Sequence, residues 1–150
     1  MKLKIALAAA AAVLVPVSLA SMASVASDET VQVYKDANCG CCGGWIDHMR
    51  TSGFDVEATN LAYEALSAKK AEAGITDEHA SCHTAFVGGY VIEGHVPAED
   101  VRRLLSERPE AVGLTAPGMP AASPSMDMGS EPYDVLLAHG DGTTDVYARH

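Results

Sequence analysis

The sequence predicts an α/β domain in which helices flank a mixed β-sheet, with an added β-hairpin at the carboxyl end. Three kinds of pattern indicate this fold class. Short segments alternate apolar and polar residues as half-buried strands do, and longer segments repeat apolar residues at helical spacing. Two-residue turn signals separate two pairs of the apolar runs, as in hairpins. We therefore expect a sheet with both parallel and antiparallel strands.

The first half of the domain alternates strands and helices. Residues 31–36 (VQVYKD) alternate as a strand, and residues 43–54 carry apolar residues at helical spacing. Residues 54–60 alternate again, and Asn60 is placed to cap a helix over residues 61–74. The expected order is strand, helix, strand, helix.

The second half begins with a hairpin. Residues 83–96 contain two apolar runs divided by Gly88-Gly89, and Pro97 opens a helical pattern that continues to Pro109. The complete order, β-α-β-α-β-β-α, is that of the thioredoxin-like fold. In that fold a C-x-x-C motif between the first strand and the first helix is the reactive site.

The carboxyl-terminal part changes in composition. Residues 109–132 are rich in Pro, Gly, Ala, Ser and Met without periodicity, which predicts a long loop. Residues 133–149 contain two alternating runs around Asp141-Gly142 and predict the added hairpin. Residues 30–150 are therefore expected to form a single domain.

The first 26 residues have the pattern of a secretory signal peptide. Lys2 and Lys4 precede an apolar stretch, and small residues allow cleavage near Ala20, Ala23 or Ala26. The apolar stretch is short and includes a proline, which argues against a retained membrane span. We expect an exported, periplasmic protein that is free of the membrane after cleavage.

The charge of the chain excludes one class of partner. Its formal net charge is −10, and the longest basic runs are the pairs Lys69-Lys70 and Arg102-Arg103. Without a basic patch, a nucleic-acid or anionic-membrane partner is not expected, whereas a cation is electrostatically favoured.

Three of the four cysteines lie within four positions, at Cys39, Cys41 and Cys42, and the fourth is Cys82. In an oxidising compartment four cysteines can form structural disulfides. One such pairing joins Cys39 to Cys42 and Cys41 to Cys82, and other permutations are open.

The cysteines can instead act as ligands or nucleophiles. A thiol at a helix amino terminus has a lowered pKa, which favours the reactive thiolate. Cys82-His83 precedes the third expected strand, where thioredoxin-like oxidoreductases place a proline. We expect Cys82 to fold back against the first three cysteines, which favours a thiolate metal site over disulfide exchange.

Several separated segments carry a family resemblance. CGCCGGWIDHM, ASCHTAFVGGYVIEGHVPAEDVRRLL, PGMP, SPSMDMG and EPYDVLL resemble the CopG-like periplasmic copper-resistance proteins. The resemblance implies a thioredoxin-like domain that binds copper through its cysteines, with a proposed role in copper redox handling. It assigns the metal ligands to Cys39, Cys41, Cys42 and Cys82 and suggests other periplasmic copper-handling proteins as partners.

The ligand types indicate the metal independently. Four thiolates form a soft set that favours Cu(I), and three cysteines packed into one turn suit a polynuclear cluster. Zinc is the rival, although a Cys₄ zinc site usually takes two separated C-x-x-C pairs.

The remaining candidates are weaker. His83 reaches the metal of Cys82 only if the strand has not begun at Cys82, because adjacent strand side chains point to opposite faces. Met119, Met126 and Met128 are soft ligands or a lid, or else residues of a mobile loop. The other five histidines are expected at the surface; they are His48, His79, His95, His139 and His150.

The hypothesis with most support is a copper-binding protein that holds Cu(I) in a cysteine cluster and has a copper redox role. The alternative is a thiol-disulfide oxidoreductase that uses Cys39 and Cys42. The sequence assigns no catalytic residue, so a copper oxidoreductase activity is left open.

Overall fold

The computed structural model describes residues 29–150, which form seven strands and three helices. The predicted signal peptide, residues 1–26, lies outside the described residues. In chain order the elements are β1 (Val31–Lys35), α1 (Gly40–Thr51), β2 (Val56–Asn60), α2 (Tyr63–Glu72), β3 (His83–Val87), β4 (Tyr90–Glu93), α3 (Ala98–Glu107), β5 (Gly113–Thr115), β6 (Asp134–Ala138) and β7 (Thr144–Arg149).

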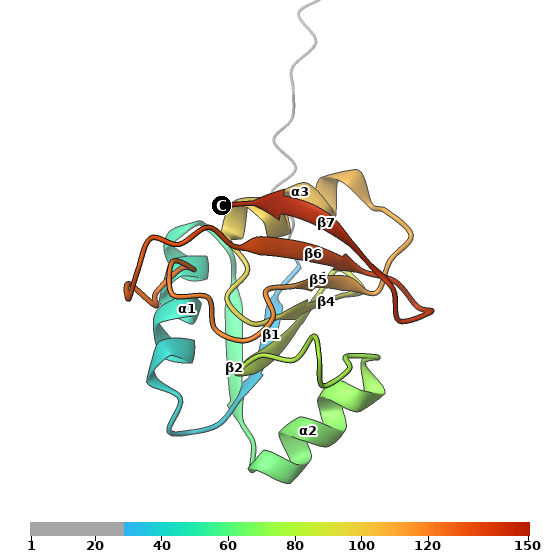
Figure 1. Cartoon of the computed structure of the whole chain (residues 1–150). Helices are drawn as coiled ribbons and strands as arrows, with labels where there is room; N and C mark the ends of the chain where they lie inside the picture. Colours follow the sequence, from blue (N-terminus) through green and yellow to red (C-terminus); the bar gives the residue numbers. More distant parts are fainter. Residues whose placement is uncertain (1–28) are drawn as a thin grey trace, which may run out of the picture.

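All seven strands belong to one mixed sheet of order β2-β1-β3-β4-β5-β6-β7 (Figure 1). The pairs β1–β2 and β4–β5 are parallel, and the other four neighbouring pairs are antiparallel. The expected α/β class with a mixed sheet is therefore confirmed. β6 and β7 form an antiparallel hairpin that extends the sheet at one edge.

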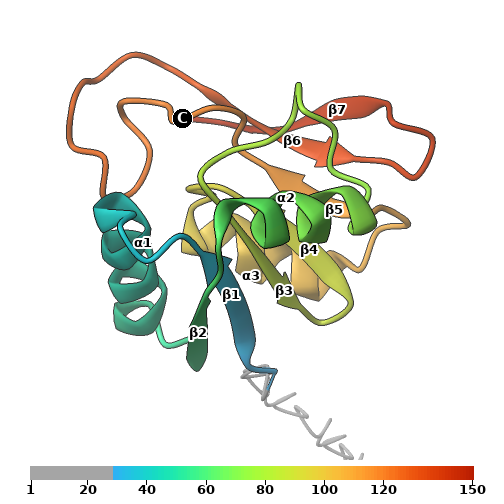
Figure 2. The same cartoon turned by 90° about the horizontal axis from the view of Figure 1, so that it is seen from below.

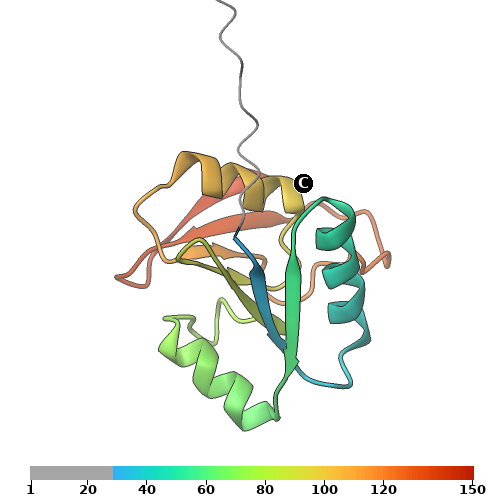
Figure 3. The same ribbon diagram turned by 180° about the vertical axis from the view of Figure 1, so that it is seen from behind.

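The helices cover the sheet from different sides. α2 lies on one side and α3 on the other (Figures 1 and 2). α1 stands beside β2 (Figure 3). Trp45 of α1 is fully buried and donates a hydrogen bond from Nε1 to the carbonyl oxygen of Val96, at 2.8 Å. This bond joins the helix that carries three cysteines to the β4–α3 connection.

The hairpin between β3 and β4 turns where the sequence predicts. Gly88 and Gly89 have φ values of 58° and 85°, so both occupy the left-handed region that glycine tolerates best. The helix after β2 begins later than expected, because Asn60 is the last residue of β2 and Ala62 precedes α2.

Residues 109–132 differ from the expected continuous loop. They contain β5, a three-residue strand that pairs with β4 and β6 and links the hairpin to the rest of the sheet. A strand of three residues carries too few alternations to produce a readable pattern. Between residues 29 and 150, no helix has the length and apolar character needed to cross a membrane.

Candidate metal site

The first three cysteines lie at the amino terminus of α1. Cys39 is the residue before the helix, and Cys41 and Cys42 lie in its first turn, so the helix begins earlier than the sequence pattern predicts. No side chain caps this end of α1, and no acidic residue lies in its first turn. The free backbone N–H groups therefore give the three sulfurs a positive local field.

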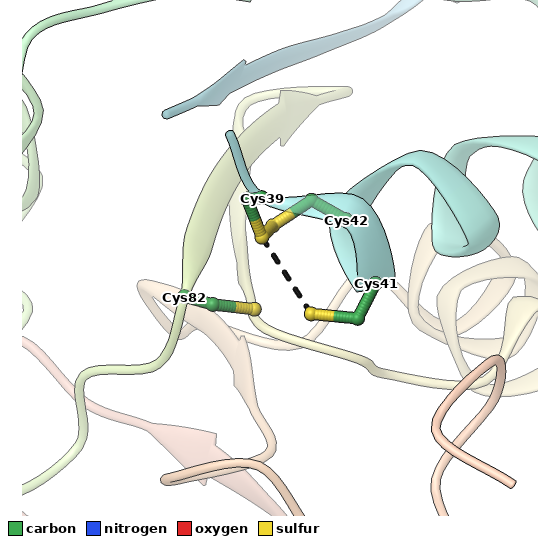
Figure 4. A group of neighbouring side chains, drawn as sticks. All are labelled: Cys39, Cys41, Cys42 and Cys82. Carbon is green, nitrogen blue, oxygen red and sulfur yellow. Dashed lines mark hydrogen bonds between the residues drawn. A yellow bond between two sulfur atoms is a disulfide. The ribbon is translucent and has the colours of Figure 1, made fainter. Parts of the chain in front are cut away.

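Cys82 lies beside these three cysteines. It immediately precedes β3, the neighbour of β1 in the sheet, and its side chain points toward Cys41 and the start of α1 (Figure 4). The Sγ atoms of Cys39, Cys41, Cys42 and Cys82 lie within 4.8 Å of one another. Cys42 is buried and the other three are half-buried, so the cluster is open to solvent on one side.

Two of the four thiols are oxidised in this structure. Cys39 and Cys42 form a disulfide, while Cys41 and Cys82 are free. The Sγ atoms of Cys39 and Cys41 are 3.6 Å apart. The fully paired alternative joined Cys39 to Cys42 and Cys41 to Cys82. The structure contains the first of these bridges and lacks the second, so the thiols of Cys41 and Cys82 stay available.

Two buried imidazoles lie on the inner side of Cys82. Its Sγ atom is 3.2 Å from Nε2 of His95 and 3.4 Å from Nδ1 of His83. Cys42, Cys82, His83 and His95 form a second group whose ligand atoms lie within 4.8 Å of one another. Burial, and next the neighbouring Cys41, raise the pKa of Cys82 to about 11. Binding a metal would therefore release the proton that this thiol retains at neutral pH.

The ring of His83 can face the sulfur of the adjacent Cys82 because β3 begins at His83 and leaves Cys82 outside the strand. The expectation that His83 can share a metal with Cys82 depends on this arrangement. The expectation that His95 lies at the surface is wrong: both His83 and His95 are completely buried. Desolvation lowers the pKa of both histidines, and the proximity of His95 lowers that of His83 further, so both imidazoles are neutral.

An ion pair fixes the backbone next to Cys82. Lys70 of α2 and Glu93 of β4 form a salt bridge with side-chain exposures of 11% and 0%. The carboxylate of Glu93 accepts a hydrogen bond from the Ser81 N–H at 2.7 Å, and Lys70 donates to the Ser81 carbonyl at 3.1 Å. Both backbone groups of the residue before Cys82 are thereby held.

The segment after β5 crosses the site. Gly118 forms a bridge with Ser81, and the carbonyl of Pro124 accepts a hydrogen bond from Nδ1 of His95 at 2.7 Å. A Cβ atom added to Gly44 of α1 would lie 2.8 Å from Cβ of Ser125, so this segment contacts the helix closely. Figure 2 shows it alongside the amino-terminal end of α1.

The methionine candidates lie on this segment. Met119 and Met128 are 54% and 74% exposed, whereas Met126 is half-buried. Their role as ligands stays a prediction.

Four other histidines lie apart from the two ligand groups. His48 is half-buried and accepts a hydrogen bond from the Ala98 N–H, and the ring of His79 contacts the hydroxyl of Thr76. His139 and His150 contact the carboxylates of Asp145 and Asp100, respectively.

Comparison with solved structures decides the family. One chain, described as "Copper resistance protein copG- Form 1", is 41% identical, with a TM-score of 0.75, over 81% of this chain and 96% of that chain. A second, "Copper resistance protein copG- Form 2", is 39% identical, with a TM-score of 0.74, over 81% and 98%. The chain belongs to the CopG copper resistance family. The expected family resemblance is therefore confirmed.

Residues 79–126 of this CopG relative also match a family model described as "Protein of unknown function, DUF411". That segment includes Cys82, His83, His95 and the segment that crosses the site. No curated protein matches the chain.

Sequence patterns did not identify His95 or the Lys70–Glu93 pair. One signal was available for the pair: Glu93 ends the apolar run YVIE, where a buried acid requires a partner. For His95 no comparable signal exists, since its burial depends on the segment that passes over it.

Proposed function

We propose that this CopG relative is a periplasmic copper-binding protein of copper resistance that holds Cu(I) with Cys39, Cys41, Cys42 and Cys82. The observation that carries the proposal is that four sulfurs from two distant segments lie within 4.8 Å of one another. Such a group can bind one soft ion or bridge several. The names of the two similar structures, both copper resistance proteins, support copper as the substrate.

The fit of the donor set supports Cu(I) over harder cations. Thiolates are soft ligands, and burial of Cys42 lowers the local dielectric, which strengthens metal–thiolate attraction. The half-exposed Cys41 and Cys82 provide an entry path. Zinc remains the rival metal for four thiolates, and only competition between the two ions separates them.

The state of the cysteines supports a redox role. The thiols of Cys39 and Cys42 can each give one electron to a Cu(II) ion. An S–S bond forms between them, two protons leave to solvent and two Cu(I) ions result. A disulfide between Cys39 and Cys42, as in this structure, would be the oxidised product of that step. Return to the dithiol form requires an external thiol or electron donor.

The location and the detailed fold are part of the proposal. The signal-like residues 1–26 support export to the periplasm, where other copper-handling proteins are the expected partners. The order β1-α1-β2-α2-β3-β4-α3, with β3 antiparallel to β1, supports a thioredoxin-like core. A C-x-x-C disulfide at the start of α1 has the position expected in that fold.

Anaerobic titration tests the binding. The reduced mature chain is mixed with Cu(I), separated from a competing chelator by desalting, and analysed for copper and zinc. We expect copper to be retained and zinc to be displaced by it. A chain that loses its copper to the chelator, or keeps zinc against equimolar Cu(I), would overturn the proposal.

The second candidate, a thiol-disulfide oxidoreductase using Cys39 and Cys42, is favoured by the disulfide itself. An insulin-reduction assay separates the two functions. Under the copper proposal the chain reduces insulin slowly, and Cys82→Ser abolishes metal retention. An oxidoreductase would reduce insulin with Cys82 replaced and would need no metal.

A further inference from the structure

Formation of the Cys39–Cys42 disulfide does not remove every metal ligand from the site. Cys82 keeps a free thiol, and it lies between two buried imidazoles, at 3.2 Å from His95 and 3.4 Å from His83. One thiolate and two imidazoles are a ligand set that copper binds in proteins. The oxidised chain therefore retains a complete candidate site.

Ring nitrogens of both histidines are directed at the sulfur of Cys82. The carbonyl of Pro124 can only accept, so Nδ1 of His95 carries the hydrogen and the lone pair of Nε2 faces Cys82. Nδ1 of His83 faces the same sulfur from a second ring. Two ring nitrogens from different residues therefore converge on one thiol.

The ring of His83 has few polar partners of its own. Among the described residues, Nε2 of His83 is buried without a hydrogen-bond partner, and the hydrogen-bonding contact of its Nδ1 is with Cys82. A cation that replaces the thiol hydrogen would contact the sulfur of Cys82, Nδ1 of His83 and Nε2 of His95 at once.

The pocket is also built as metal sites commonly are. A ligating histidine usually donates its other N–H to a carbonyl or carboxylate, which fixes the tautomer. His95 does so with Pro124, and Ser81, next to Cys82, is held by Lys70 and Glu93. The ligand groups are therefore oriented before a metal arrives.

We infer that the disulfide form of the chain holds one copper ion through Cys82, His83 and His95. This site rests on the proposed copper function and extends it to the oxidised state. It would keep one Cu(I) ion after Cys39 and Cys42 have given up their electrons, so copper is retained while the thiolate cluster is dismantled.

The test uses the full mature chain with Cys41→Ser and an intact Cys39–Cys42 disulfide, so that Cys82 is its one free thiol. Cu(I) is added anaerobically as a soluble complex, the excess is removed by desalting against a chelator, and copper is measured per chain. We expect one copper ion to be retained, with sulfur and nitrogen neighbours in X-ray absorption.

His95→Gln and His83→Gln in the same background should weaken retention by more than the about tenfold typical of losing an outer-shell partner. The matched control is His79→Gln, whose ring contacts Thr76 instead of the cysteines. Reduced His95→Gln with all four cysteines should still bind Cu(I), which shows that the variant folds.

Each result is decisive. If the disulfide form retains no copper while the reduced chain does, the inference is overturned and the proposed function stands. If neither form retains copper, both fail. Equal retention by His95→Gln and its Cys41→Ser parent would also overturn the inference.

Discussion

The two segments that meet at the cysteine site are held by different means. The segment at the start of α1 has no side-chain cap, and two of its three cysteines are half-buried. The segment around Cys82 is fixed by the Lys70–Glu93 pair, by the bridge to Gly118 and by two buried histidines. The contrast indicates a division of labour: the helix side changes its redox state, and the β3 side provides a preorganised ligand frame.

The first way to break this comparison is to remove the sulfur of the fixed segment. Cys82→Ser should abolish the retention of Cu(I) by the reduced chain, because Cys82 belongs to both ligand groups. Cys39→Ser should keep part of the copper, since Cys41, Cys42 and Cys82 remain as thiolates. Copper analysis after chelator challenge measures both. Equal losses in the two variants would contradict a special role for the β3 side.

The second test concerns the ion pair that holds Ser81. Lys70→Met leaves the buried carboxylate of Glu93 without its cation and should cost about 3 kcal/mol in unfolding free energy. Denaturant unfolding of the metal-free disulfide form measures this value.

The matched control for Lys70 is Lys69→Met. Lys69 lies over the ring of Tyr34, 4.2 Å from its centroid, and its loss should cost no more than about 1 kcal/mol. Similar destabilisation in the two variants would show that the buried pair does not fix the frame.

Sequence patterns predicted the parts of this comparison unequally. The spacing of the cysteines and the alternation of the strands led directly to the helix side and to the position of Cys82 next to it. Periodicity is a local property, so it identified the individual elements, and their order predicted that Cys82 lies beside the first helix. The frame around Cys82 depends on contacts between residues far apart in the chain, such as Lys70 with Glu93 and His95 with Pro124.

β5 was missed for a related reason. Its three residues lie in a segment of Pro, Gly and Ala, and pairing with β4 and β6 stabilises it. Tertiary context, not local propensity, therefore determines the strand. The same segment buries His95, so missing its structure also led to the wrong surface assignment for that residue.

The third test sharpens the difference in burial between the two sides. In metal-free Cys41→Ser with its disulfide intact, Cys82 should titrate above pH 9, because desolvation, the largest cause of its raised pKa, remains. The folded state then favours the protonated thiol. Its contribution to stability is complete below the unfolded pKa and is lost as pH rises through the folded value.

Thiolate absorption during a pH titration, with the chain in denaturant as reference, checks this expectation. Titration of the folded thiol at or below the midpoint of the unfolded chain would contradict the burial of Cys82.

The smallest expected effect concerns the contact between α1 and the segment that crosses the site. Gly44→Ala places a methyl group 2.8 Å from Cβ of Ser125 and should destabilise the domain by about 1–2 kcal/mol. Gly43→Ala meets nothing within 4 Å and should instead stabilise α1 by up to about 1 kcal/mol. Thermal unfolding of both variants measures the difference. If the two alanines have the same effect, the segment does not pack on the helix in solution.

Anomalous diffraction from crystals of the reduced, Cu(I)-loaded chain tests the central claim most directly, because it locates copper relative to each sulfur. We expect copper bonded both to Sγ of Cys82 and to at least one thiolate in the first turn of α1. Copper bound by Cys39, Cys41 and Cys42 alone, with Cys82 turned away, would contradict a site shared by the two segments.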